Sequence, residues 1–232
     1  MRVSAGWAPS HHEPLQGIFV TGTGTEVGKT IVAAAIARTL VVAGRSVGVF
    51  KPAVTGLDQG GEPDHALLRR AAASRQSDEE IAPYRYGPPM SPHLAAELAG
   101  EWIEPARLVE GALRAARGND FLVCEGVGGL LVPLCRDYKV IDLAIRLSMP
   151  LVIAASPGLG TINHTLLTIE AARAAGLTVA GVVLTPWPEE PSAIEASNRE
   201  MIAALGEVAV ETLPPLDLSS PSSWPRLAPR RG

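Results

Sequence analysis

The 232-residue chain has few of the features that mark disulfide-rich, nucleic-acid-binding or membrane-spanning proteins. It has two cysteines, Cys124 and Cys135, with no C-x-x-C pair and no cysteine–histidine cluster, which argues against a disulfide scaffold and a metal or redox centre. The 20 basic residues are outnumbered by 24 acidic ones, so a net charge of -4 gives no general attraction to nucleic acid or an anionic membrane. No apolar run is long enough to span a bilayer. We expect a cytoplasmic protein with small-molecule partners.

Apolar segments of strand length alternate with segments of helical pattern along most of the chain. This alternation predicts an α/β fold with a doubly wound, mostly parallel sheet, whose ligand site lies at the carboxyl ends of the strands. With 47% hydrophobic residues, the chain can bury the core of one such domain. We expect a flexible leader over 1–16, a single domain over 17–216 and a disordered Ser- and Pro-rich tail over 217–232. The expected strands are 18–20, 47–50, 121–124, 151–155, 179–184 and 208–213.

A candidate phosphate-binding loop, TGTGTEVGKT, occupies Thr21–Thr30 between the first expected strand and an alanine-rich helix. Its glycines permit a sharp turn, and the helix start adds N–H groups and partial positive charge. Lys29 is placed to reach the β- and γ-phosphates, and the Thr30 hydroxyl is placed to face Mg²⁺. The spacing departs from G-x-x-x-x-G-K-[ST], because Thr23 stands at the first glycine position. A surface glycine turn is the alternative, but Gly-Lys-Thr between strand and helix favours a nucleotide site.

Charged residues follow two other expected strands or begin a helix. Lys51 ends the strand 47–50 and is followed closely by Thr55, which can supply a hydroxyl to the same crevice. Glu125 ends the strand 121–124 and precedes a glycine-rich turn, which is typical of a carboxylate that reaches a nucleotide-bound Mg²⁺. Asp64 begins a helix, where a carboxylate serves either as a cap or as a Mg²⁺ ligand, and the sequence leaves both roles open.

A second anion site is indicated at Gly160–His164, where a tight loop meets a helix start. The alternative for Asn163 and His164 is that they are ordinary cap and surface residues.

Five motifs occur in an order that resembles dethiobiotin synthetases: GTGTEVGKT (22–30), KPAVTG (51–56), SPH (91–93), EGVGG (125–129) and GTINH (160–164). The resemblance covers 17–216 and implies a P-loop NTPase architecture. It also implies ATP- and Mg²⁺-dependent ring closure of 7,8-diaminononanoate with CO₂ to dethiobiotin, a step of biotin synthesis. An amine would capture CO₂ as a carbamate, the γ-phosphoryl group would pass to the carbamate, and the second amine would displace phosphate.

The resemblance also implies roles for individual residues and a homodimer in which the substrate carboxylate lies near the GTINH segment of the partner subunit. The implied catalytic residues are Lys51, Lys29 and Thr25, and the implied Mg²⁺ ligands are Thr30, Asp64 and Glu125. The implied substrate contacts are Thr25, Thr55, Gly160, Thr161 and Asn163. The implied nucleotide contacts are Glu26, Val27, Gly28, Lys29, Thr30, Ile31, Asp64, Glu125, Gly126, Val127, Gly128, Thr185, Pro186, Pro214, Pro215 and Leu216.

Base recognition is where the chain departs from the family pattern. Thr185-Pro186 stands where many members have Asn-Asp to read adenine, so the site can accept another nucleoside triphosphate such as CTP. Three other functions compete with the synthetase. A related amidoligase would need an ammonia source, and no glutaminase-like cysteine motif is present. A partition-type ATPase predicts a lysine at the position of Gly24, and a nucleotide-binding regulatory subunit stays open.

Overall fold

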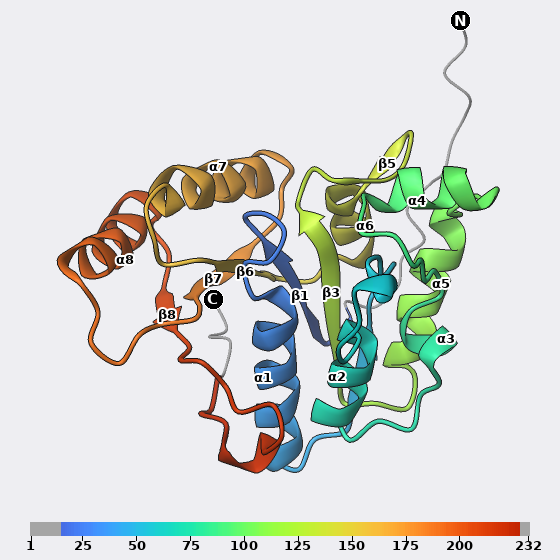
Figure 1. Cartoon of the computed structure of the whole chain (residues 1–232), viewed down its shortest axis with the longest axis horizontal. Helices are drawn as coiled ribbons and strands as arrows, with labels where there is room; N and C mark the ends of the chain where they lie inside the picture. Colours follow the sequence, from blue (N-terminus) through green and yellow to red (C-terminus); the bar gives the residue numbers. More distant parts are fainter. Residues whose placement is uncertain (1–14, 228–232) are drawn as a thin grey trace, which may run out of the picture.

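The computed structural model describes residues 15–227, so most of the expected leader and the last five residues lie outside the described part. Its centre is a six-stranded sheet in the order β2-β3-β1-β6-β7-β8, in which every pair of neighbours is parallel (Figure 1). The expectation of a doubly wound parallel sheet is therefore confirmed. The strands are β1 Gly17–Gly22, β2 Val47–Phe50, β3 Phe121–Gly129, β6 Leu151–Ala155, β7 Val179–Leu184 and β8 Val210–Thr212.

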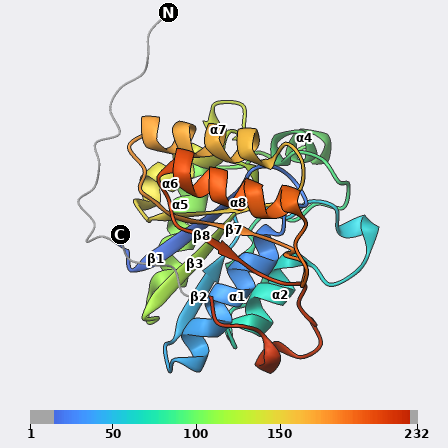
Figure 2. The same cartoon turned by 90° about the vertical axis from the view of Figure 1, so that its left-hand side faces the viewer.

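Helices cover both faces of this sheet, because side chains along each buried strand alternate between the two faces. In β1, Ile18 and Val20 pack into the cluster formed with α1 and α2, whereas Phe19 packs into the cluster formed with α4, α5 and α6. Figure 2 shows the layers from the side. The helices are α1 Lys29–Val42, α2 Asp64–Ala71, α3 Asp78–Ile81, α4 Pro92–Ala99, α5 Pro105–Ala116, α6 Val140–Leu147, α7 Thr161–Ala174 and α8 Ala193–Gly206.

The strand order places the phosphate-binding loop at the switch point of the sheet. β1 is central, with β3 on one side and β6 on the other, and the chain crosses to the β6 side after β3. Crevices at the carboxyl ends of such strands are where α/β sheets bind ligands. The loop after β1, the loop after β2 and the end of β3 therefore meet at one edge.

Short elements were harder to predict than long ones. The sequence reasoning missed α3 and the hairpin of β4 (Pro133–Cys135) and β5 (Tyr138–Lys139), and it ended the third strand at Cys124, whereas β3 continues to Gly129. A signal for α3 was present, because Ser77 and Glu80 form a capping box at its start. None of the helices in the described part is long and apolar enough to cross a membrane.

The expectation of a disordered tail from Asp217 is wrong for residues 217–227, which we call the C-terminal strap. Trp224 and Leu227 are buried against the cluster that contains α1. The Trp224 indole donates from Nε1 to the Asp217 carbonyl at 2.7 Å, and the Leu227 amide donates to Thr39 Oγ1 at 2.9 Å. Serine and proline dominate the composition here, but a few apolar side chains pack the strap against the cluster that contains α1. The backbone of the strap runs beside one end of α1 (Figure 1).

Candidate nucleotide and magnesium site

The phosphate-binding loop folds into a turn that its glycines and one strained residue make possible. Gly28, at φ 84°, precedes α1, and Glu26 also has a positive φ of 59°. A Cβ at Gly22 would lie 2.7 Å from Val27 Cγ2, so glycine allows the loop to fold over the strand end. Lys29 Nζ donates to the Gly24 carbonyl at 2.6 Å, which holds its ammonium group inside the loop.

Beside this loop, Lys51 lies between two carboxylates. It is 3% exposed, and its ammonium group bonds to Oε1 of the fully buried Glu125 and lies 2.8 Å from Asp64 Oδ2. Thr30 Oγ1 donates to the same Glu125 oxygen at 2.8 Å. Asp64 lies at the first position of α2, with Pro63 as the N-cap residue and no side-chain cap. The Asp64 carboxylate is therefore directed at Lys51 rather than used as a helix cap.

The charges of this group shift one another's pKa values. Burial disfavours the charged form of Lys51, but the carboxylates of Glu125 and Asp64 outweigh burial and raise the pKa of Lys51. Burial also raises the pKa of Glu125, against the opposing charge of Lys51. For Asp64, burial is outweighed by the charge and hydrogen bond of Lys51, so the pKa of Asp64 is lowered. Burial lowers the pKa of Lys29, with Glu125 opposing it.

These groups share a cavity of about 440 Å³ that opens between the loop and the start of α2. It brings together most of the residues that sequence reasoning assigned to phosphate, metal and substrate. It also includes residues to which sequence reasoning gave no role, one of them, Ala53, within the KPAVTG motif. The lining residues assigned from sequence are Thr25, Glu26, Gly28, Lys29, Thr30, Ile31, Lys51, Thr55, Asp64, Glu125, Val127 and Gly128, and the others are Ala53, Gln59, Glu62, Leu67 and Leu218.

The oxygen groups at the centre of the cavity fit a magnesium ion bound with phosphate. Glu125 Oε2 is buried and has no hydrogen-bond partner, and Asp64 and Thr30 supply further oxygens nearby. Mg²⁺ is commonly held by one or two carboxylates together with substrate phosphates rather than by a protein cage. The described residues contain no group of three or more His, Cys, Asp or Glu that could hold a metal ion.

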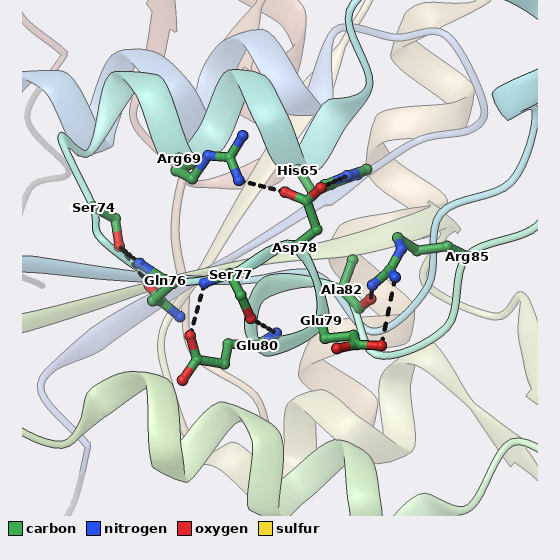
Figure 3. A network of polar contacts seen from close by, with 10 residues as sticks. All are labelled: His65, Arg69, Ser74, Gln76, Ser77, Asp78, Glu79, Glu80, Ala82 and Arg85. Carbon is green, nitrogen blue, oxygen red and sulfur yellow. Dashed lines mark hydrogen bonds and ion pairs between the residues drawn. The ribbon is translucent and has the colours of Figure 1, made fainter.

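A polar network joins α2 to the start of α3 (Figure 3). Arg69 Nη1 donates to Asp78 Oδ1 at 2.5 Å, and His65 Nε2 lies 3.7 Å from Asp78 Oδ2. Gln76 pairs with both backbone groups of Val49, which closes the exposed edge of β2. The loop between α2 and α3 is thereby fixed to the strand that presents Lys51.

The predicted base contacts lie on one side of the phosphate-binding loop. A Cβ at Gly28 would lie 2.4 Å from Thr185 Cγ2, so the loop after β7 packs against the phosphate-binding loop. The Trp187 amide donates to the Leu213 carbonyl at 2.8 Å, which places the segments containing Pro186 and Pro214–Leu216 side by side. The structure thus brings these two segments together beside the loop, although none of their residues lines the 440 Å³ cavity.

Four further sequence-predicted residues lie away from the cavity. Gly126 is buried, and a Cβ there would meet Val140. Gly160, Thr161 and Asn163 lie at the start of α7 and do not line the cavity either. Thr161 is 5% exposed, and its hydroxyl lies 3.4 Å from that of Thr165, so its side chain faces the helix rather than a ligand.

The strand order, the loop and the cavity define a P-loop α/β protein. Solved structures of the same architecture include the cell division ATPase MinD of Pyrococcus furiosus, which is 16% identical with a TM-score of 0.53 over 86% of this chain and 83% of that one. A chain of the MinC:MinD cell division protein complex of Aquifex aeolicus is 13% identical with a TM-score of 0.55 over 87% and 82% of the two chains. At these identities the likeness shows the fold alone.

Sequence relatives identify the family. Residues 16–223 match a family described as an AAA domain. An ATP-dependent dethiobiotin synthetase of Rhodococcus erythropolis is 41% identical over 88% of this chain and 90% of its own length. That of Anaeromyxobacter dehalogenans is 43% identical over 81% and 84%, and that of Bacillus subtilis is 36% identical over 84% and 85%. The chain belongs to the dethiobiotin synthetase family.

Proposed function

We propose that this protein closes the ureido ring of dethiobiotin from 7,8-diaminononanoate, CO₂ and a nucleoside triphosphate. The observation that carries the proposal is the pair of buried lysines, Lys29 and Lys51, in one cavity with Thr30, Asp64 and Glu125. Phosphoryl transfer depends mainly on positioning and on stabilising negative charge. A cavity with two ammonium groups and three oxygen ligands supplies both needs.

Each lysine has its own proposed role. Lys29, which is held inside the loop, neutralises the β- and γ-phosphates, and Lys51 neutralises the carbamate and the phosphoryl group that it accepts. The raised pKa of Lys51 supports this role, because it keeps the ammonium charged at neutral pH. Glu125 and Asp64 hold Lys51 in place until the anions bind.

Mg²⁺ would be held by Thr30, Asp64 and Glu125, and when bound it would neutralise charge on the triphosphate. The unpartnered Glu125 Oε2 supports this assignment.

The diamine is proposed to bind between two cavities that meet at Thr25. The second cavity, of about 480 Å³, is bordered by Leu130, Leu131 and Leu167, whose side chains suit an alkyl chain. Thr55 lines the first cavity and can bond to an amine or to the carbamate. Thr25 lines both, which supports its assignment to the reacting end of the substrate.

We propose a homodimer in which Gly160 and Asn163 contact the substrate of the partner subunit. Gly160 and Asn163 line neither cavity of their own subunit, and the exposed side chain of Asn163 supports this arrangement. The neighbouring Leu159 is 95% exposed, as expected for a side chain that a second subunit covers. Thr161 is buried, so only its position at the start of α7 contributes to this contact with the partner's substrate. Sedimentation of the protein as a monomer at assay concentration would contradict this part of the proposal.

The base is proposed to be selected weakly, so that CTP is used as well as ATP. The side chain of Thr185 is 2% exposed and packs on Gly28, and Pro186 has no side-chain hydrogen-bonding group. No amide side chain is therefore offered at these two positions to read adenine.

We place the enzyme in the cytoplasm, where nucleoside triphosphates are made.

Phosphate release tests the proposal. Protein, Mg²⁺, bicarbonate and ATP or CTP are expected to release phosphate only after 7,8-diaminononanoate is added. Nucleotide hydrolysis at the same rate with and without the diamine would favour a switching ATPase. Nucleotide binding without any turnover would favour a regulatory subunit.

A further inference from the structure

One arginine joins two segments that border the nucleotide cavity. The Arg70 guanidinium donates from Nε to Glu62 Oε1 at 3.0 Å and from Nη2 to Glu62 Oε2 at 2.5 Å. Its Nη1 donates to the Leu218 carbonyl at 2.5 Å. Glu62 belongs to the loop before α2, and Leu218 belongs to the C-terminal strap, 148 positions along the chain from Arg70. Both line the cavity, so Arg70 links two of its walls.

The chemistry of this link is specific to arginine. A guanidinium has donors in a fixed planar arrangement, so it can bond to both oxygens of a carboxylate and still donate to a third acceptor. A lysine ammonium at this position would be a point charge without that geometry. The contact with the Leu218 carbonyl is to the main chain, so it fixes the path of the strap and not only one side chain.

The strap meets the cavity with an apolar group. Leu218 and Leu67, which lies one turn before Arg70 on α2, both line the cavity and pack in the same cluster of side chains. Neither side chain can bind a phosphate, whereas both offer contact surface to a sugar or a base. The far end of the strap is anchored to α1 by the buried side chains of Trp224 and Leu227 and by the Leu227 amide, which donates to Thr39 Oγ1. Loss of Arg70 would therefore loosen the strap at Leu218 while its far end stays attached.

We propose that Arg70 is a positioning residue for the nucleotide, and that it holds Leu218 against the nucleoside part of the triphosphate. The inference rests on the nucleotide site proposed above. Arg70 does not itself line the cavity, so it acts through Glu62 and Leu218. Contacts to the nucleoside are made equally in the ground state and the transition state, so their loss raises KM for the nucleotide without lowering kcat.

Steady-state kinetics of Arg70→Gln, with Arg114→Ala as the matched control, test this proposal. Arg114 is an exposed arginine whose ion pair to Glu110, at 3.6 Å, lies on α5 away from the cavity. We expect Arg70→Gln to raise KM for the nucleotide about fivefold, with kcat and KM for the diamine changed less than about twofold. Hydrogen exchange of the amides near Leu218 is expected to accelerate, while those near Trp224 keep their protection. Arg70→Lys should recover only part of the affinity.

The proposal is overturned if Arg70→Gln binds the nucleotide as tightly as the control, or if kcat and both KM values worsen together. If Arg70→Gln does not fold, Leu218→Ala carries the test, since it leaves the Arg70–Glu62 pair intact, and an unchanged KM for the nucleotide overturns the proposal. If the proposed nucleotide site is wrong, the result differs from failure of the Arg70 proposal. The wild-type protein would then bind no nucleotide, or would bind it no more tightly than Lys29→Ala does.

Discussion

Replacing Lys51 with methionine separates the structural role of this lysine from its role in catalysis. The substitution removes the positive partner of Glu125, which is fully buried, and of Asp64, whose side chain is 43% exposed. Breaking a buried pair by removing one partner costs about 3–5 kcal/mol, because a charge stays buried without compensation. Solvent screens the Asp64 contact, so most of the cost comes from Glu125. Glu125 can take up a proton instead, which limits the loss, and we expect about 3 kcal/mol at neutral pH.

The measurement is urea unfolding of the wild type, Lys51→Met, Glu125→Gln and the double variant. Because the double variant removes both members of the buried pair, we expect its stability to return to within about 1 kcal/mol of the wild type. Its activity is not expected to return, since loss of a group that stabilises transition-state charge costs about 10²–10³ in kcat. A Lys51→Met protein as stable as the wild type, or a double variant no more stable than Lys51→Met, would refute the reasoning. Near-normal kcat in either would remove Lys51 from the mechanism.

Three other predictions follow from the same geometry. Asp64→Asn is expected to lower the free energy of unfolding by about 1 kcal/mol. Because folding lowers the pKa of Asp64, this difference from the wild type should persist above the ordinary pKa of 3.8 and close as pH falls through the folded-state pKa. A difference in urea unfolding that does not change with pH would contradict this. Gly28→Ala places a Cβ 2.4 Å from Thr185 Cγ2 at a residue with φ 84°, so a binding titration should show weaker nucleotide binding. Gly44→Ala is the control, because Gly44 has a similar φ of 79° but a Cβ there would have no atom within 4 Å. Equal nucleotide affinities of the two variants would count against the loop geometry. Trp224→Ala is expected to lower the free energy of unfolding by about 2 kcal/mol, because its buried indole anchors the strap, and an unchanged urea midpoint would show that it does not.

The sequence predicted the elements whose signals are local and strong. The strands at 47–50, 151–155 and 179–184 match β2, β6 and β7 residue for residue, because each is a continuous apolar run bounded by turn residues. It also predicted that Lys51 and Glu125 would reach the end of β1, because parallel strands carry such residues to one edge.

What the sequence could not predict depends on contacts between distant segments. The strap lacks a periodic pattern, and its order comes from tertiary contacts such as that of Leu227 with Thr39, 188 positions away. The link from Arg70 to Leu218 is of the same kind. The choice left open at Asp64 was between a cap and a ligand, and only the position of Lys51, directly after β2, shows which way the carboxylate points.

Incorporation of ¹³C-bicarbonate tests the central claim most directly. With the purified protein, 7,8-diaminononanoate, Mg²⁺ and ATP or CTP, we expect one labelled ureido carbon in dethiobiotin for each phosphate released, measured by mass spectrometry. Phosphate release without labelled product, or labelled product that forms equally well with Lys51→Met, would contradict the account.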